Sequence, residues 1–249
     1  MSVHGESGET LSALGARLSA EPLPTPSDER PAPNAAAPAE SREPGVERRR
    51  PRTPHPARRL VGPLIVLLTL VPAALLLLRV VRDDLGTDPV ETLEQQTGIW
   101  ALRFLLLSLA VTPLRRLLGW NWLVKHRRTL GLAAFGYATC HLLVYFVIDQ
   151  GLALGYVVED VVEHPWVTIG MATWLMLLPL AVTSTTGWVR RLGGRRWNRL
   201  HRLAYLCAIG GVVHYTLAVK RDVSLPLVYV AIALLLLGYR LAVRRRAVA

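Results

Sequence analysis

The sequence predicts an all-α membrane protein, a bundle of six transmembrane helices with both termini in the cytoplasm. Its 249 residues are 51% hydrophobic with a mean hydropathy of +0.32, yet they carry a net charge of +11. The basic residues gather in short blocks between long apolar stretches, a pattern that membrane topology requires and a nucleic-acid-binding face does not. None of the stretches alternates apolar and polar residues as a transmembrane β-strand does, so helices are predicted.

Residues 1–58 differ in composition from the rest of the chain. They are rich in Pro, Ala, Ser, Glu and Arg, as in the run Pro-Leu-Pro-Thr-Pro at 22–26. Such a segment cannot bury enough apolar surface to offset the entropy lost on ordering. We therefore expect a disordered cytoplasmic tail over residues 1–58 and one membrane domain over residues 59–249.

Six apolar stretches follow the tail. Each comes near the ~20 residues with which a helix crosses a hydrocarbon core of ~30 Å. The expected spans are Leu60–Val81, Gly98–Leu114, Thr129–Ile148, Trp166–Val189, Leu203–Val219 and Leu225–Val243.

The orientation follows from the loops. Basic residues lie before the first span, in the second–third and fourth–fifth connections, and after the last span, whereas the loops at 83–94 and 159–163 are acidic. Because lysine and arginine favour cytoplasmic loops, both termini are predicted to be cytoplasmic. The positive charge then has anionic membrane lipids as its expected partners, and no nucleic acid is expected.

Two histidines at membrane depth carry the strongest functional signal. His141 lies 13 residues beyond Arg128, and His214 lies 13 residues beyond His201. Both spans begin on the cytoplasmic side, so at ~1.5 Å per residue each histidine lies about 20 Å from the inner surface. Two imidazoles at equal depth on separate helices suit a bis-histidine haem. Interhelical hydrogen bonding and a proton or metal-ion pathway remain alternatives.

His201 does not fit a second haem of this kind. It lies about 140° around the helix from His214, since 13 residues turn through about 1300°. No histidine lies at the matching inner depth of the third span, because His126 falls in the preceding loop. His201 is left as an alternative ligand, a propionate partner or part of another cofactor site.

The arginines near the spans have two interpretations each. Arg103 either extends to the outer headgroups or faces inward and neutralises a haem propionate. On the inner side, Arg127 and Arg128 together with the arginines of 190–202 could hold a flavin phosphate or haem carboxylates, with anionic lipid headgroups as the simpler partners.

Short motifs add a resemblance that covers about three quarters of the chain, from Leu60 onward. They are Thr97-Gly98 with Arg103, Thr112-Pro113-Leu114, the segments 127–132 (RRTLGL) and 138–142 (ATCHL), Thr183-Ser184-Thr185, Leu192-Gly193, the segment 197–205 (WNRLHRLAY), His214-Tyr215 and Val219-Lys220. In these segments the chain resembles the MsrQ (YedZ) family of haem-binding membrane subunits, which is related to the ferric reductase transmembrane domain.

The resemblance implies a b-type haem held by the histidines at His141, His201 and His214, with FMN as a further cofactor. It also implies a bacterial inner-membrane subunit that passes electrons from the quinone pool to MsrP, a periplasmic molybdopterin enzyme. That enzyme reduces methionine sulfoxide in oxidised proteins. The depth argument favours His141 with His214 as the axial pair.

Two other functions stay open at this point. A ferric or cupric reductase, or a cytochrome b subunit for another enzyme, would keep the haem and change the acceptor. A transporter or scaffold would have no cofactor, but a transporter is expected to show intramembrane carboxylates, a broken helix or an internal repeat. The predicted spans show none of these clearly.

Overall fold

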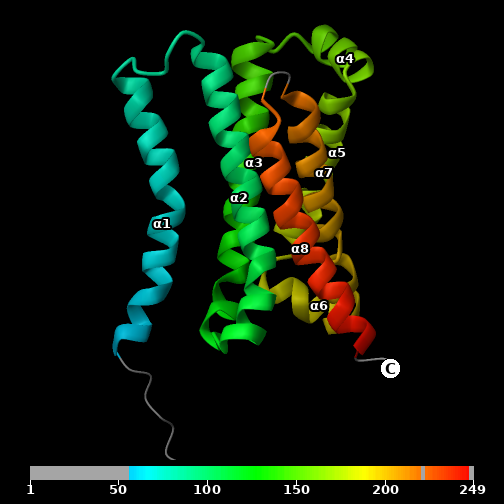
Figure 1. The fold of residues 1–249 in the computed structure, drawn as a ribbon. Helices are drawn as coiled ribbons and strands as arrows, with labels where there is room; N and C mark the ends of the chain where they lie inside the picture. The colour runs from blue at the N-terminus through cyan, green and yellow to red at the C-terminus, as the bar shows by residue number, and fades with distance from the viewer. Residues whose placement is uncertain (1–55, 220–221, 247–249) are drawn as a thin grey trace, which may run out of the picture. The chain divides into compact units, whose positions relative to one another are not determined.

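The computed structural model describes residues 56–219 and 222–246, and within these ranges it is helical and contains no strand. Nearly all of the predicted tail therefore lies outside the described residues. The elements are α1 (Pro56–Val81), α2 (Pro89–Leu118), the 3₁₀-helix η1 (Asn121–His126), α3 (Arg127–Leu143), the π-helical η2 (Val144–Asp149), α4 (Leu154–Glu163), α5 (Pro165–Val182), α6 (Thr186–Leu200), α7 (Leu203–Ala218) and α8 (Ser224–Arg246) (Figure 1).

Several helical segments in the described part are long and apolar enough to cross a membrane. They are Val61–Val81, Pro89–Leu118, Asn121–Asp149, Pro165–Val182 and Ser224–Val243. α7 is equally apolar but has 16 residues, fewer than the ~20 of a typical span. The chain is thus an all-helical, multi-pass membrane protein, with five candidate spans in the described part and one shorter apolar helix.

The second span begins earlier than Gly98, where the hydropathy pattern placed it. Asp88 caps α2 by accepting a hydrogen bond from the Glu91 backbone N–H at 2.9 Å, and Pro89 occupies the first helical position. Capping extends the helix into sequence that is too polar to be recognised by hydropathy. As a result Glu91 and Glu94, which the sequence placed in a loop, lie in the first turns of α2.

The predicted span Trp166–Val189 is wrong at its C-terminal end. α5 ends at Val182, and Thr183, Ser184 and Thr185 separate it from α6. The Thr183 hydroxyl donates to the Pro179 carbonyl at 2.6 Å, and the Thr185 side chain accepts from the Trp188 N–H at 3.4 Å. These local hydrogen bonds compete with helix continuation and start a new, arginine-rich helix.

Two short helices lie at opposite ends of the bundle (Figure 1). α4 was not predicted; it stands in the acidic loop between the third and fourth expected spans. α6 carries the basic residues of the next connection and bends at Gly193, whose φ is 71°. The chain therefore has an end with the acidic loops and an end with the arginines.

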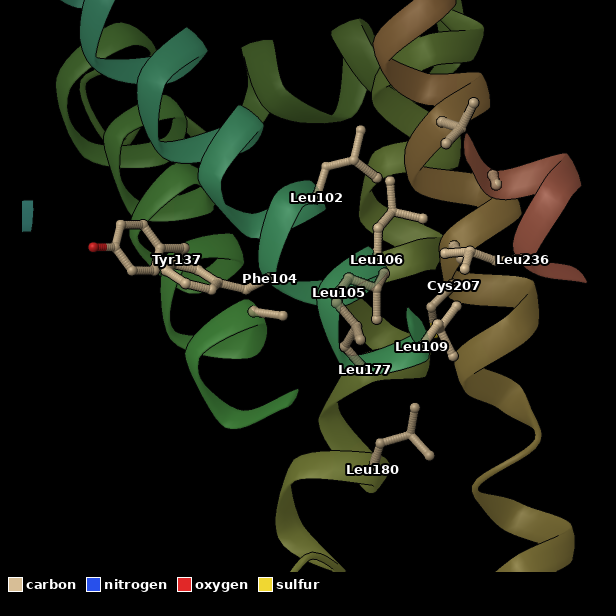
Figure 2. Packing of buried hydrophobic residues seen from close by; sticks show 14 residues of the cluster. Leu102, Phe104, Leu105, Leu106, Leu109, Tyr137, Leu177, Leu180, Cys207 and Leu236 are labelled. Atoms are coloured by element: carbon tan, nitrogen blue, oxygen red, sulfur yellow. The ribbon is translucent and has the colours of Figure 1, made fainter. Parts of the chain in front are cut away.

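The long helices pack in two close pairs. α2 packs along α3 and α5 along α7; contacts between α3 and α5 and between α2 and α7 join the pairs, and α8 packs against α7 and α2. Their side chains form one buried cluster, drawn in Figure 2. Lipid tails are as apolar as leucine, so this cluster stabilises the bundle mainly by close packing rather than by leaving water.

α1 makes fewer contacts with the other helices. Its main polar link is Tyr137 of α3, whose hydroxyl donates to the Thr69 carbonyl at 2.9 Å and accepts from the Ala73 N–H at 2.8 Å. Pro72 lies between these two residues of α1, and because it has no N–H it leaves the Leu68 carbonyl without its usual helical donor. The site described next is built by α2, α3, α5 and α7.

Candidate functional site

The structure brings His141 of α3 and His214 of α7 together. Their ring centres lie 6.0 Å apart, and the ring planes are inclined at 71°. The two residues are 73 positions apart in the sequence and come from different helix pairs. The equal depth that the charge spacing predicted is thus accompanied by direct proximity of the two rings.

His141 is held by the neighbouring helix α2. Its Nδ1 lies 2.9 Å from the backbone carbonyl oxygen of Glu94. The ring rests on Gly98, one turn further along α2, where an added Cβ would lie 3.3 Å from the imidazole. The missing side chain at Gly98 therefore lets the ring approach the backbone closely enough to reach the carbonyl.

His214 is held in the same way by α5. Its Nδ1 lies 2.7 Å from the carbonyl oxygen of Trp166, and its ring rests on Gly170, where an added Cβ would lie only 2.8 Å from the imidazole. In each case the glycine follows the carbonyl residue by four positions. The site thus consists of two equivalent parts, each made by one helix pair.

These hydrogen bonds fix the tautomer of both rings. A carbonyl oxygen can only accept, so each Nδ1 carries the proton and each neutral imidazole keeps its lone pair on Nε2. An Nδ1–H donated to a backbone carbonyl is the usual outer-shell support of a metal-binding histidine. Both histidines are therefore oriented as Nε2 ligands.

Both rings line a cavity of about 990 Å³ between the two helix pairs. Near the histidines its wall consists largely of apolar and small residues, and toward the end where α4 lies it contains acidic residues. The apolar and small residues include Gly98, Leu102, Leu105, Ala138, Gly170, Leu177 and Gly211, and the acidic ones are Glu91, Glu94, Asp149, Asp160 and Asp222.

The residues present fit haem. Two imidazoles on opposite sides of one metal ion, with bonds of about 2 Å, have ring centres about 6 Å apart. Among the described residues no three His, Cys, Asp or Glu side chains gather as a metal site. A porphyrin would supply the remaining ligands of an iron ion held by two imidazoles. The cavity volume also lies at the upper end of the range for cofactor pockets, about 300–1,000 Å³.

Arg103 does not line this cavity in the described structure. Its Nε donates to the Tyr229 hydroxyl of α8 at 2.8 Å, and its guanidinium stacks over Trp100 at 4.6 Å. Because α2 begins at Pro89, Arg103 lies about 20 Å along the helix rather than near its start. Tyr229 in turn contacts Tyr215, which lines the cavity. The proposed contact of Arg103 with a propionate remains a prediction.

His201 lies apart from the histidine pair, about 20 Å from His214 along the axis of α7. Its Nε2 is 3.2 Å from the Thr183 hydroxyl, and its ring stacks on Trp197 with centres 3.9 Å apart. Trp197 also donates to the Thr183 carbonyl at 2.9 Å. Burial lowers the pKa of His201, and the nearby positive charge of Arg127 lowers it further. In this position His201 fastens the α6–α7 turn to the end of α5.

One hydrogen-bond network at the acidic end was not predicted from the sequence. The Tyr145 hydroxyl, in the π-helical η2, donates to Asp160 Oδ2 at 2.6 Å, and His164 Nδ1 lies 2.6 Å from Asp160 Oδ1. His164 directly precedes α5, so its contact with Asp160 helps to fasten α4 beside the cavity.

A second residue was overlooked although its signal was visible. Arg240 lies inside the sixth expected span, and an arginine at such a position indicates a function by default. It lies among α2, α7 and α8 near the arginine-rich end.

Comparison with known proteins agrees with this geometry. Residues 97–212, which include His141 and His201 and end two residues before His214, match the family model described as ferric reductase like transmembrane component. No solved structure matches the chain.

Three relatives share the description "Protein-methionine-sulfoxide reductase heme-binding subunit MsrQ". The protein from Rhodospirillum rubrum is 52% identical over 68% of this chain and 82% of its own length. Those from Azospira oryzae and Ralstonia nicotianae are 45% and 43% identical, over 73% and 75% of this chain and 78% and 87% of their own lengths. At this identity and coverage, the chain belongs to the MsrQ family.

Proposed function

We propose that this chain is an electron-transfer subunit of the bacterial inner membrane that binds b-type haem between His141 and His214. The observation that carries the proposal is the pair of rings 6.0 Å apart, each with its Nδ1 on a backbone carbonyl and both beside one cavity. We further propose that α7 is a sixth crossing, since it is apolar and packs along α5, and that both termini are cytoplasmic.

Each surrounding group has a defined task. The carbonyls of Glu94 and Trp166 keep a proton on Nδ1 and aim Nε2, while Gly98 and Gly170 allow the rings to reach them. The apolar part of the wall excludes water from the metal position. When bound, haem supplies one-electron redox chemistry, and the protein sets its position and potential through these ligands and their burial.

The proposal for the electron source and acceptor rests on the family resemblance. We propose that electrons come from a quinol in the membrane and pass to a periplasmic, MsrP-like molybdopterin subunit that reduces methionine sulfoxide in oxidised proteins. The relatives' description as subunits of a methionine-sulfoxide reductase supports this acceptor. FMN as a further cofactor is supported by the resemblance alone.

A second acceptor has one observation in its favour. The matched family model is that of a ferric reductase like component, so the same haem subunit could reduce a ferric or cupric chelate. The haem site would be the same, and only the oxidant would differ.

A reduced-minus-oxidised absorption spectrum of the purified protein tests the proposal. We expect a b-type band that appears when a quinol is added. Adding an MsrP-like subunit with methionine sulfoxide should then reoxidise the band, whereas reoxidation only by a ferric chelate would favour the second acceptor. Absence of any band in protein made with ample haem would contradict both and favour a transporter or scaffold without cofactor.

A further inference from the structure

At the arginine-rich end, a second polar site lies between α2, α3, α7 and α8. Arg240 of α8 donates through Nη1 to the Tyr205 hydroxyl and through Nη2 to the Leu109 carbonyl at 2.7 Å and to Thr112 Oγ1 at 3.0 Å. Its guanidinium also lies 4.9 Å from the centre of the Tyr205 ring. These contacts hold the guanidinium in one orientation inside a candidate membrane span.

The hydrogen bonding of Arg240 is incomplete. Its Nε is buried and has no hydrogen-bond partner within the described residues. A buried donor without a partner is destabilising, and more so when it is charged. Nε therefore needs an acceptor that the described residues do not provide.

A second positive charge lies nearby. Arg127, half-buried at the start of α3, is within electrostatic range of Arg240, and the two charges repel each other. No carboxylate is available to balance them: between residues 56 and 249, Asp and Glu occur only at 83–94, 149–163 and 222, in the loops and helix ends of the opposite end. Two partly buried positive charges without a neighbouring carboxylate are destabilising, so an anion that is not part of the protein would stabilise this site.

We propose that Arg240, Arg127 and the Tyr205 hydroxyl bind the phosphate group of an acidic phospholipid. Arg240 and Arg127 are each only partly buried, so a headgroup in the membrane can reach them. The site lies near the end of the α8 span, and the arginines of α6 lie at the same end, where anionic headgroups gather. Basic pockets between transmembrane helices on the cytoplasmic side are a known kind of site for such lipids.

Arginine suits this ligand because it has five N–H groups. In Arg240, three of them are taken by Tyr205, Leu109 and Thr112, which leaves the Nε N–H and one Nη1 N–H to donate to phosphate oxygens. The lipid would neutralise the Arg127–Arg240 pair and link α3 to α8. This site is separate from the histidine pair, so the proposal does not depend on the function proposed above.

The experiment uses the full-length protein purified in detergent and then delipidated. Binding of phosphatidylglycerol and of phosphatidylcholine is measured by native mass spectrometry and by the rise in Tm on titration. We compare the wild type with Arg240→Gln and Arg127→Gln, and use Arg128→Gln as the matched control, because Arg128 is exposed, adjacent in sequence and equal in charge. Circular dichroism checks the fold of each variant.

The wild type should bind one phosphatidylglycerol in preference to phosphatidylcholine. Arg240→Gln and Arg127→Gln should each weaken this binding by about tenfold or more, and Arg128→Gln by less than about twofold. If Arg240→Gln does not fold, Arg240→Lys and Arg127→Gln decide the matter, since both should reduce affinity for the acidic lipid. Equal affinities in all variants, equal binding of both lipids, or retention of a phosphorylated molecule without acyl chains would overturn the proposal.

Discussion

The two halves of the histidine site share a backbone design and differ in their side chains. The α2–α3 half-site consists of Glu94, Gly98 and His141, and the α5–α7 half-site of Trp166, Gly170 and His214. In both, a carbonyl holds Nδ1 and a glycine four positions later receives the ring. The residue that supplies the carbonyl is an acid in one half and a tryptophan in the other, because only its backbone is used.

The half-sites also differ in how closely the ring approaches the helix. The distance from an added Cβ to the imidazole is 3.3 Å at Gly98 and 2.8 Å at Gly170, and the Nδ1–carbonyl distances are 2.9 Å and 2.7 Å. The α5–α7 half-site is therefore the tighter one. Its ring has less freedom to move aside, so it should be the more sensitive to any change in volume.

Replacing either histidine by alanine should have the largest effect. His141→Ala and His214→Ala each remove one of the two proposed haem ligands, so we expect the purified protein to lose its b-type band while the helices still insert. Haem per protein, measured by absorption against protein mass, is the readout. Full haem content in both variants would mean that these two residues are not the axial pair.

Gly170→Ala should come next. A methyl group 2.8 Å from the imidazole cannot be accommodated without moving His214 away from the Trp166 carbonyl. Loss of such outer-shell support typically weakens metal binding by about 10–100-fold, and we expect a fall of that size in haem affinity. Gly136→Ala is the control, since Gly136 is helical and an added Cβ there meets nothing within 4 Å. Equal haem affinity in these two variants would refute the role of Gly170.

Gly98→Ala should have a smaller effect of the same kind. The added methyl group is 3.3 Å from His141, so a shift of a few tenths of an ångström can accommodate it. We expect haem affinity to fall by less than about tenfold and the band position to change before the haem is lost. Haem titration of the two glycine variants side by side decides which substitution lowers haem affinity more. A larger loss of affinity in Gly98→Ala would show that the distance from the added Cβ to the imidazole does not determine the sensitivity of the half-sites.

Only part of this design could be predicted from the sequence. The pairing of His141 with His214 was accessible because charge blocks mark the membrane surface and histidines are rare at that depth. The roles of the Glu94 and Trp166 carbonyls could not be predicted, since every residue has a backbone carbonyl and the side chain does not show which carbonyl accepts a hydrogen bond from a histidine. Gly170 carried no signal either, because glycine is common in membrane helices.

The errors in helix boundaries have a common cause. A hydropathy pattern identifies stretches of apolar residues, whereas capping interactions determine where a helix begins and ends. Asp88 and Pro89 start α2 within polar sequence, and the hydroxyls of Thr183 and Thr185 end α5 and start α6 within what was taken as one span. Arg103 was consequently placed near a helix end, although it lies well inside α2.

His201 offers a test of whether a third histidine belongs to either half-site. Its hydrogen bond to Thr183 and its stacking on Trp197 join α6 and α7 to α5. We expect His201→Ala to keep the band of the His141–His214 pair and to lower the Tm by a few °C, the effect of losing about 1 kcal/mol. Thr183→Val should lower the Tm similarly. A halved haem content in His201→Ala, with Thr183→Val unaffected, would instead make His201 a ligand, as the family resemblance implies.

The smallest effect is expected from deleting residues 1–50. Every group of both half-sites lies between Glu94 and His214, and the helices that carry them pack against one another within residues 89–218. Haem content and quinol-driven reduction should therefore equal those of the full chain at equal membrane abundance. Loss of the band in this truncation would show that the half-sites are incomplete without the N-terminal segment, and a slower reduction with full haem content would assign that segment to the delivery of electrons.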